Sequence, residues 1–381
     1  MSHSLLVIAG EISGDMHAAR VIRELRERDP DLVCWGIGGD ELAAAGVKLR
    51  YDLRDMAVLG LWEVLKRYLF FRRVFRDMLN EVERRKPEAV LLVDYPGFNL
   101  RFARAARKRG VKILYYISPQ VWAWDRSRVR RMAEWVDRLM VIFPFEVEVF
   151  NETSLRVDFV GHPLVDRARE ASKEPAPKLP WAAEGTRVAL LPGSRQQEVE
   201  RIVPLMLAAA CRIEGERPDT AFLVAAPSDR IAALSQALID QTAARPANIT
   251  VVAGHTRHVL RQARGAMVAS GTATIEAALM ACPMIILYKT AALTYWFGKH
   301  LIRVPWLGMV NIVAQRLLCP EFLQHDTDPD RMAQALLPLL DDTPEWTAMV
   351  SGLTEVKEAL GEGDSAGQAA DIIHQELHGE Q

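Results

Sequence analysis

Short runs of consecutive apolar residues alternate with helical patterns along almost the whole chain, and this alternation restricts its fold more than any other feature. Strands that are apolar on both faces are typical of parallel sheets, because helices cover such sheets on either side. We therefore predict an α/β fold with doubly wound parallel sheets. In the N-terminal half, the runs predict strands at residues 5–9, 32–37, 89–93, 112–117 and 139–142.

A second series of the same kind follows a segment rich in Pro, Ala and charge, and predicts strands at 187–191, 221–225, 249–253, 266–269 and 284–288. The 381 residues are more than a single hydrophobic core usually organises. We predict two Rossmann-like domains, of residues 1–165 and 187–363, joined by a linker at 166–186. A helix of residues 364–381 could pack back on the first domain.

Composition and charge exclude several other classes of protein. No apolar stretch approaches the roughly 20 residues that span a bilayer, and the run at residues 5–9 is too short for a signal peptide. The four cysteines include no C-x-x-C pair and are typical of reduced cytoplasmic thiols. No nucleic-acid partner is expected, because the net charge is −2 and no recognised binding module is present. We expect a cytoplasmic protein, soluble or peripherally bound to a membrane.

The segment after the first predicted strand is the first candidate site, and it reads Ala9-Gly10-Glu11-Ile12-Ser13-Gly14-Asp15. Gly10 and Gly14 permit a tight turn, and Ser13 or Asp15 could cap the next helix. The segment lacks the G-x-G-x-x-G pattern, and Glu11 would be poorly placed beside a pyrophosphate, which argues against a nicotinamide enzyme. A purely structural turn is the alternative.

Asp94 is the candidate proton acceptor. It follows the predicted strand 89–93, so its carboxylate should lie at the edge of the sheet where ligands bind. Partial burial there would raise its pKa and suit it to accept a proton. The alternative is a cap for a helix that begins near Leu100, although Asn99 is better placed for that role.

Two tryptophans, Trp122 and Trp124, lie in a loop after the predicted strand 112–117. Exposed tryptophans are costly unless they cover a ligand or a core, and packing is the expected role of at least one of them. Four arginines follow and could hold a phosphate, although a solvated helix face is the default: Arg126, Arg128, Arg130 and Arg131.

The loop after the strand at 187–191 has the residues of an anion site. Gly193, Ser194 and Arg195 precede a predicted helix, and N–H groups at a helix start can bind phosphate. The loop lacks the Lys-Ser/Thr ending of a Walker A motif, which argues against ATP hydrolysis.

A similar loop follows the strand at 266–269. Ser270, Gly271 and Thr272 lead into another helix and could bind phosphate oxygens. Glu276 lies about one turn into this helix and could bind two ribose hydroxyls. A favourable acid in a first helical turn is the alternative for Glu276.

Residues 61–82 predict an amphipathic helix with an unusually wide apolar face and flanking positive charge. This suits an anionic membrane surface or an acyl-chain groove, whereas packing on the sheet would explain only a narrow stripe. The contact residues that we predict are Trp62, Leu65, Tyr68, Leu69, Phe71, Arg72, Phe75 and Arg76.

No histidine or cysteine pattern predicts a metal site. His255 and His258 lie three residues apart, but no cysteine or acid stands at ligand spacing from them. His17 and His162 are expected to be structural, with a binding role left open. Neither a metal nor another cofactor is therefore expected.

Taken in order, these blocks resemble the lipid-A-disaccharide synthase family, which are inverting glycosyltransferases of the two-domain GT-B architecture. The resemblance spans nearly the whole chain. It rests on residues 9–15, 93–99, 118–124, 161–162, 191–195, 270–276, 282–283 and 310–324.

The resemblance implies that UDP-2,3-diacylglucosamine condenses with 2,3-diacylglucosamine 1-phosphate, without a metal, to give the β-1′,6-linked lipid A disaccharide and UDP. It implies that Asp94 is the essential acid, that Gly10–Asp15, Trp122 and Trp124 line the acceptor side, and that helix 61–82 meets the inner face of the cytoplasmic membrane. The donor would contact Ser194, Arg195, Ser270, Gly271, Thr272, Glu276, Asn311 and Gln315.

One position departs from the resemblance, because Gly97 stands where the family can carry a second acid. A mechanism that requires both acids would fail here, so Asp94 is the single candidate. A UDP-N-acetylglucosamine 2-epimerase is the alternative enzyme, and a noncatalytic nucleotide- or lipid-binding protein is the alternative of another class. A homodimer is also conceivable.

Overall fold

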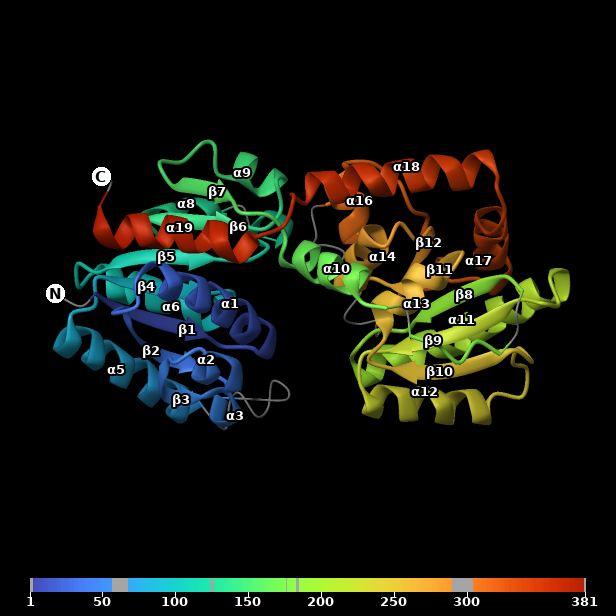
Figure 1. Cartoon of the computed structure of the whole chain (residues 1–381), viewed down its shortest axis with the longest axis horizontal. Coiled ribbons are helices and arrows are strands. Elements are labelled where there is room, and N and C mark those ends of the chain that lie inside the picture. The colour runs from blue at the N-terminus through green and yellow to red at the C-terminus, as the bar shows by residue number, and fades with distance from the viewer. Residues whose placement is uncertain are drawn as a thin grey trace. The chain divides into compact units, whose positions relative to one another are not determined.

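The computed structural model describes residues 3–56, 68–124, 127–175, 177–182, 185–289 and 304–379. The chain forms two compact units: the first ends at Pro163 and resumes at Glu362, and the second comprises Leu164–Gly361 (Figure 1). Helix α10 (Pro163–Lys173) occupies the first half of the segment predicted as a linker at 166–186, and the second unit begins with it.

Seven parallel strands form the sheet of the first unit, in the order β3-β2-β1-β4-β5-β6-β7. The two edge strands, β3 and β7, were not predicted, because half-exposed polar residues interrupt their apolar pattern. The other five correspond to the predicted runs. The strands are β1 (Ser4–Ala9), β2 (Val33–Gly38), β3 (Lys48–Asp52), β4 (Ala89–Val93), β5 (Lys112–Tyr116), β6 (Arg138–Val141) and β7 (Arg156–Phe159).

Helices cover both faces of this sheet, as the apolar strands require. Side chains alternate along a strand, so Leu6 and Ile8 face one hydrophobic cluster while Leu5 and Val7 face the other. The first cluster is completed by α5 (Tyr68–Arg85), α6 (Pro96–Arg107) and α8 (Ser127–Trp135), and the second by α1 (Ile12–Arg28) and α19 (Ser365–His378). Shorter helices are α2 (Asp40–Ala44), α3 (Leu53–Met56), α7 (Val121–Trp124) and α9 (Phe145–Val149).

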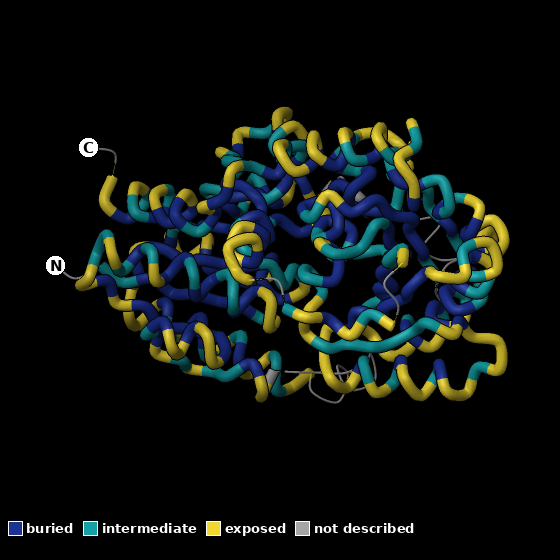
Figure 2. Tube along the Cα trace, turned by 45° about the vertical axis from the view of Figure 1, so that its right-hand side comes forward, coloured by how far each residue is buried: buried dark blue, intermediate teal, exposed yellow. Residues whose placement is uncertain are grey.

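The second unit repeats this plan with six parallel strands in the order β10-β9-β8-β11-β12-β13. In Figure 2 the strands of both units are mostly buried, and exposed residues lie on the outer helical surfaces. The strands are β8 (Arg187–Leu191), β9 (Ala221–Ala226), β10 (Ile249–Ala253), β11 (Gly265–Ala269), β12 (Met284–Tyr288) and β13 (Glu321–Leu323). The helices are α11 (Gln196–Glu216), α12 (Asp229–Gln241), α13 (Thr256–Gln262), α14 (Thr272–Leu279), α16 (Met309–Ala314), α17 (Pro329–Leu336) and α18 (Pro344–Ala359). The predicted fold class is confirmed.

The strand order reverses once in each sheet, and this point is where doubly wound folds bind ligands. In the first unit the reversal lies between β1 and β4, where Ala9 pairs with Val93. In the second unit it lies between β8 and β11, where Leu191 pairs with Val268. The carboxyl ends of these four strands are therefore the places at which site residues are expected.

Helix α19 is bound to the first unit by ion pairs as well as by apolar packing. The carboxylate of Glu376 is paired with Lys112 at 2.9 Å, with Arg138 at 3.4 Å and with Arg156. These three cations stand at the first residues of β5, β6 and β7. Glu376 therefore joins the starts of three neighbouring strands to a helix that is distant in the sequence.

Candidate active site

The reversal point of the first unit brings together the first two candidate segments. Gly10–Asp15 follows β1 and Asp94 follows β4, and these strands are hydrogen-bonded neighbours. Asp94 is half-buried and has a left-handed backbone with φ 45°. Burial, followed by the negative charge of Glu11, raises the pKa of Asp94 to about 6. A carboxylate with this pKa is a competent base near neutral pH.

Asn99 does not cap a helix, as the sequence suggested, because α6 begins earlier, at Pro96. The residue is buried, and its Nδ2 donates to the carbonyl oxygens of Val93 at 3.2 Å and Asp94 at 2.8 Å. Its amide therefore fastens the end of β4. Pro96 was an available signal, since proline favours the first position of a helix.

Asp15 has a structural role rather than a capping one. Its buried carboxylate accepts from the backbone N–H groups of Gly39 at 2.6 Å, Glu41 at 3.1 Å and Leu42 at 3.3 Å. Helix α1 begins at Ile12, and no side chain forms a cap hydrogen bond there. Of the predicted acceptor residues in this segment, Glu11 and Ser13 are exposed and Gly14 is buried.

Trp122 is a packing residue, which is the alternative considered for one of the two tryptophans. It is buried, and its Nε1 donates to Oε1 of Glu146 at 3.1 Å. Glu146 is 1% exposed, and burial raises its pKa to about 8. Trp124 ends α7, and its side chain lies outside the described residues. The arginines of α8 are exposed, as expected of a solvated helix face: Arg128, Arg130 and Arg131.

The backbone anion site predicted around Ser194 and Arg195 is filled by a side chain. The carboxylate of Glu198, in the first turn of α11, lies beside the backbone N–H groups of both residues, which act to lower its pKa against the larger effect of burial. Gly193 makes this possible, because it has φ 101° and a side chain there would overlap with the Glu198 carboxylate. An acid three residues after the helix cap was the available signal. The exposed side chains of Ser194 and Arg195 remain accessible.

The loop after β11 lies beside the loop after β8, because these two strands are parallel neighbours. Gly271 caps α14, and Thr272 begins it with its side chain exposed. Ser270 Oγ donates to the carbonyl of Leu307 at 3.0 Å, so this loop contacts the segment before α16.

Glu276 is half-buried on α14 and faces positive charge. Burial raises its pKa, although the charges of Arg257 and Arg167 oppose this. Arg257 Nε lies 3.7 Å from Glu276 Oε1, and Arg257 Nη1 donates to the carbonyl of Arg167 at 3.0 Å. Arg257 was missed because an arginine in a short helix gives no signal in the sequence.

The side chain of Asn311 is not free to bind the UDP-sugar, and this corrects the prediction that it contacts the sugar donor. Its buried Nδ2 donates to the carbonyl of Cys319 and to Glu321 Oε1, both at 2.8 Å. Its Oδ1 accepts from the N–H groups of Leu318 at 3.0 Å and Cys319 at 2.8 Å. Both amide hydrogens and both lone pairs are therefore used inside the unit. Gln315, at the end of α16, is exposed with φ 53°.

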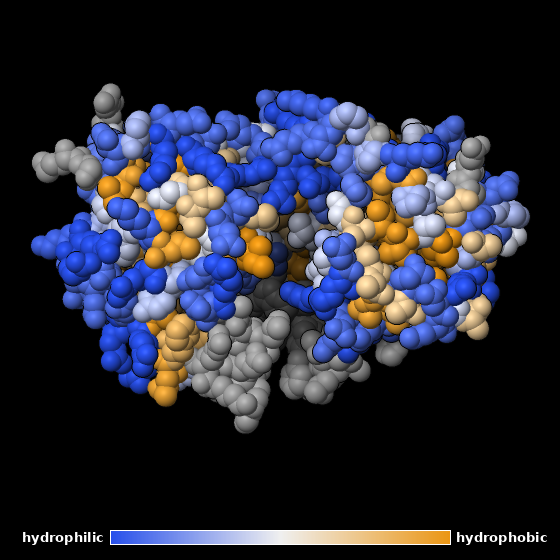
Figure 3. Space-filling model, turned by 60° about the horizontal axis from the view of Figure 1, so that its bottom comes forward, coloured by the Kyte–Doolittle hydropathy of each residue, from blue (hydrophilic) through white to orange (hydrophobic). Residues whose placement is uncertain are grey.

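Helix α5 contains the described part of the predicted membrane-contact segment. Tyr68 is 60% exposed and Leu69 is 74% exposed, and Figure 3 shows a hydrophobic strip at the lower left over this end of the helix. Phe75 is half-buried and packs edge-on against Phe98 and Phe102, so part of its ring belongs to the core and its membrane contact stays a prediction. Phe71 is half-buried, Arg72 and Arg76 are exposed, and Trp62 and Leu65 lie outside the described residues.

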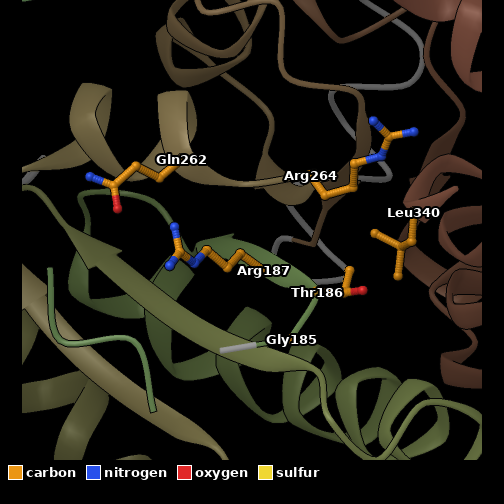
Figure 4. Close-up of a pocket in the computed structure, with 6 residues that line it drawn as sticks. All are labelled: Gly185, Thr186, Arg187, Gln262, Arg264 and Leu340. Atoms are coloured by element: carbon orange, nitrogen blue, oxygen red, sulfur yellow. The ribbon is translucent and has the colours of Figure 1, made fainter. Parts of the chain in front are cut away.

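A surface hollow in the second unit lies at the amino ends of the central strands β8 and β11. It is lined by Gly185, Thr186, Arg187, Gln262, Arg264 and Leu340 (Figure 4). Arg187 begins β8, and Arg264 pairs with Asp342 at 2.6 Å and covers the ring of Trp346. The hollow is therefore separate from the strand ends that carry the candidate residues.

The described residues provide neither a cluster of metal ligands nor a membrane-spanning helix. Across the described ranges, no group of three or more His, Cys, Asp or Glu side chains could hold a metal ion. No helix in those ranges is long and apolar enough to cross a bilayer. His162 is buried with its ring 5.0 Å from that of Phe143, and burial lowers its pKa to about 3.

Solved structures with two doubly wound units share this fold. The UDP-GlcNAc 2-epimerase of Neisseria meningitidis, bound to UDP-GlcNAc, aligns with TM-score 0.63 and 14% identity over 98% of each chain. MurG of Acinetobacter baumannii aligns with TM-score 0.60 and 12% identity over 98% of this chain and 100% of its own. The two doubly wound units, with neighbouring loops after β8 and β11 in the second, place the chain in the GT-B class.

The family within this class follows from the sequence relatives. The model of the lipid-A-disaccharide synthetase family (LpxB) matches residues 5–373. The lipid-A-disaccharide synthase of Geobacter sulfurreducens is 39% identical over 374 residues, which are 98% of this chain and 97% of the relative. That of Syntrophus aciditrophicus is 39% identical over 373 residues, or 97% and 96%. The chain belongs to the lipid-A-disaccharide synthase family and is a glycosyltransferase, and the epimerases are relatives in fold alone.

Proposed function

We propose that Asp94 is the general base in synthesis of the lipid A disaccharide, the reaction of this family. Its carboxylate takes the proton of the acceptor 6-hydroxyl while that oxygen bonds to C1 of the donor sugar. The bond from C1 to the phosphate oxygen breaks, and UDP leaves with the electron pair. One face of C1 is attacked as the other is vacated, so the configuration inverts and the β-1′,6 linkage forms.

The position of Asp94 is the observation that carries this proposal. The residue lies at the reversal point of the sheet, where ligands of doubly wound folds bind. Its pKa of about 6 leaves it mostly ionised at pH 7 and still basic enough to accept a proton. Glu11, which directly precedes α1, is exposed and acts by raising the pKa of Asp94.

The donor is UDP-2,3-diacylglucosamine, and we assign its nucleotide to the second unit. Glu276 binds the ribose hydroxyls, and Ser270, Gly271 and Thr272 bind the diphosphate at the start of α14. The exposed Arg195 guanidinium stabilises the charge that develops on UDP. These groups offset the charge of the leaving group, so the reaction needs no metal.

The acceptor is 2,3-diacylglucosamine 1-phosphate, a lipid that resides in the membrane. The exposed apolar residues Tyr68 and Leu69, with Arg72 and Arg76 on the same helix, suit the anionic inner face of the cytoplasmic membrane. Peripheral attachment there gives the enzyme access to both acylated sugars.

The test is turnover of purified protein with both lipids in the presence of EDTA, followed as released UDP and as disaccharide. Asp94→Asn should lower kcat by roughly 10²–10⁴-fold, the usual contribution of a general base, while UDP binding is retained. Asp31→Asn, which alters an exposed acid in the same unit, is the control and should keep full activity.

Two results would contradict the proposal. Turnover of Asp94→Asn within a few-fold of the unmodified enzyme would exclude Asp94 as the base. Loss of disaccharide formation in EDTA, with recovery on adding a divalent cation, would exclude the metal-free reaction.

A further inference from the structure

We propose that Tyr95 is a positioning residue for Asp94, because its ring is wedged between Gly10 and Phe98 and holds the backbone turn from which the Asp94 side chain projects. This inference rests on the proposed function of Asp94 as the base. Neither the sequence pattern nor the family resemblance assigned a role to Tyr95.

The turn itself requires an explanation. Asp94 and Tyr95 are consecutive and have φ values of 45° and 48°. The left-handed conformation is unfavourable for residues with a Cβ atom, and for a bulky tyrosine it is an outlier. Such residues persist only where the surrounding structure fixes them, and they are concentrated at functional sites.

Hydrogen bonds fix both backbone polar groups of Asp94, its N–H and its carbonyl. Its N–H donates to the carbonyl of Tyr116 at 3.0 Å. Its carbonyl accepts from Tyr115 Oη at 2.6 Å and from Asn99 Nδ2 at 2.8 Å. Beyond the junction, the carbonyl of Tyr95 accepts from the N–H groups of Phe98 at 3.3 Å and Asn99 at 3.0 Å. Backbone hydrogen bonds therefore hold both ends of the turn, and the ring of Tyr95 adds a side-chain contact between them.

The ring of Tyr95 contacts a neighbour on each side. A Cβ atom on Gly10 would overlap with the ring, so the ring lies directly against the backbone of the loop after β1. The ring also stacks on Phe98 with centroids 6.2 Å apart and planes inclined by 26°. Among the described residues, the Tyr95 hydroxyl has no hydrogen-bond partner. The aromatic ring, not the hydroxyl, therefore makes the contact.

Two substitutions separate the ring from the backbone conformation. Tyr95→Gly removes the ring but adopts positive φ without strain, so the protein should still fold. We expect its kcat, per folded molecule, to fall by roughly 10–100-fold, since small displacements of a reacting group have effects of that size. The KM for UDP-2,3-diacylglucosamine should stay within about twofold. Tyr95→Phe keeps the ring and should keep kcat within about twofold.

Gly10→Ala tests the same contact from the other side. The added methyl displaces the ring, so kcat should fall as it does in Tyr95→Gly. In the double variant the methyl has room, and kcat should be no lower than in Tyr95→Gly alone. This non-additivity would not arise from two unrelated disturbances of folding.

The outcomes separate this inference from the function on which it rests. Full turnover of Asp94→Asn would contradict both the role of Asp94 as the base and the positioning role of Tyr95. An inactive Asp94→Asn with a fully active Tyr95→Gly would overturn the positioning role alone. A Tyr95→Phe variant as impaired as Tyr95→Gly would also overturn it, because the hydroxyl would then be the working group.

Discussion

Three residues with left-handed backbones lie at the carboxyl ends of two neighbouring strands. Asp94 and Tyr95 follow β4, and Ile117, with φ 64°, follows β5. Each such residue costs about 1–2 kcal/mol relative to a normal conformation. At the residue scale, unfavourable backbone is therefore gathered around the proposed base, where the geometry of a side chain affects function most directly.

The charge of Glu11 provides a prediction at this scale. The pKa of Asp94 is about 6 because of burial and then of Glu11. Glu11→Gln removes the like charge, so this pKa should fall. A base acts when deprotonated, hence kcat/KM rises with pH through its pKa, and the acid limb of the profile should move to lower pH. A limb that stays in place or moves upward would contradict the role of Glu11. Glu27→Gln, at an exposed position of α1, the helix that Glu11 precedes, is the control.

Residue positions were predictable where the order of strands alone decides them. Asp94 directly follows β4, and Glu276 lies on the helix after β11, as their places after apolar runs indicated. The roles of both residues stay predictions. Asn99 and Asn311 were misassigned, because a polar residue near a helix end looks the same in sequence whether it caps, fastens a strand or binds a ligand. The role that we propose for Tyr95 had no signal in the sequence, because it depends on a backbone angle that tyrosine does not favour.

Helix α5 packs on the sheet along one face and exposes apolar residues to solvent at its first turn. Val74, Met78 and Val82 are buried against the sheet, which accounts for the narrow apolar stripe. Tyr68 and Leu69, at its first turn, are exposed and account for part of the additional width. Strands were predicted well where both faces are buried, but β13, with three residues and a glutamate, gave no apolar run.

The exposed end of α5 gives a prediction at the element scale. Replacing both Tyr68 and Leu69 by Ser removes apolar area that could enter a membrane, so co-sedimentation with vesicles containing phosphatidylglycerol should fall roughly fivefold or more. Asn80→Ser, which alters an exposed polar residue of the same helix, should leave binding unchanged. Equal binding by the double variant and the control would exclude this end of the helix as a membrane contact.

Across the whole molecule, the same doubly wound plan occurs twice, and the sequence predicted both occurrences from the two series of apolar runs. The attachment of α19 was expected only as an option, because its anchor depends on three cations that are distant in sequence. Burial alone would raise the pKa of Glu376, but the hydrogen bond and charge of Lys112, with the charges of Arg156 and Arg138, lower it overall.

This lowered pKa predicts how stability depends on pH. The contribution of Glu376 is complete above its unfolded pKa of roughly 4.3 and is lost as the pH falls through the lower folded value. Glu376→Gln should therefore reduce the free energy of unfolding at pH 7 by about 1–3 kcal/mol. The difference should shrink in acid. Urea unfolding at pH 7 and in acid, below the folded pKa of Glu376, measures this difference in the free energy of unfolding. Glu362→Gln, at an exposed position, is the control. An equal difference at the two pH values would contradict the stabilising role of the ion pairs of Glu376.

The path of the chain has a consequence for its synthesis. Ala369, Ala370 and Ile373 of α19 belong to the core of a unit whose remaining residues end at Pro163. Everything from Leu164 to Gly361 must leave the ribosome before this helix exists, which takes on the order of 10–40 seconds at usual rates of elongation. Throughout that interval, one face of the nascent first sheet is covered by α1 but lacks α19. The unit made first is thus completed last, and its apolar face is a natural substrate for chaperones that bind chains during translation.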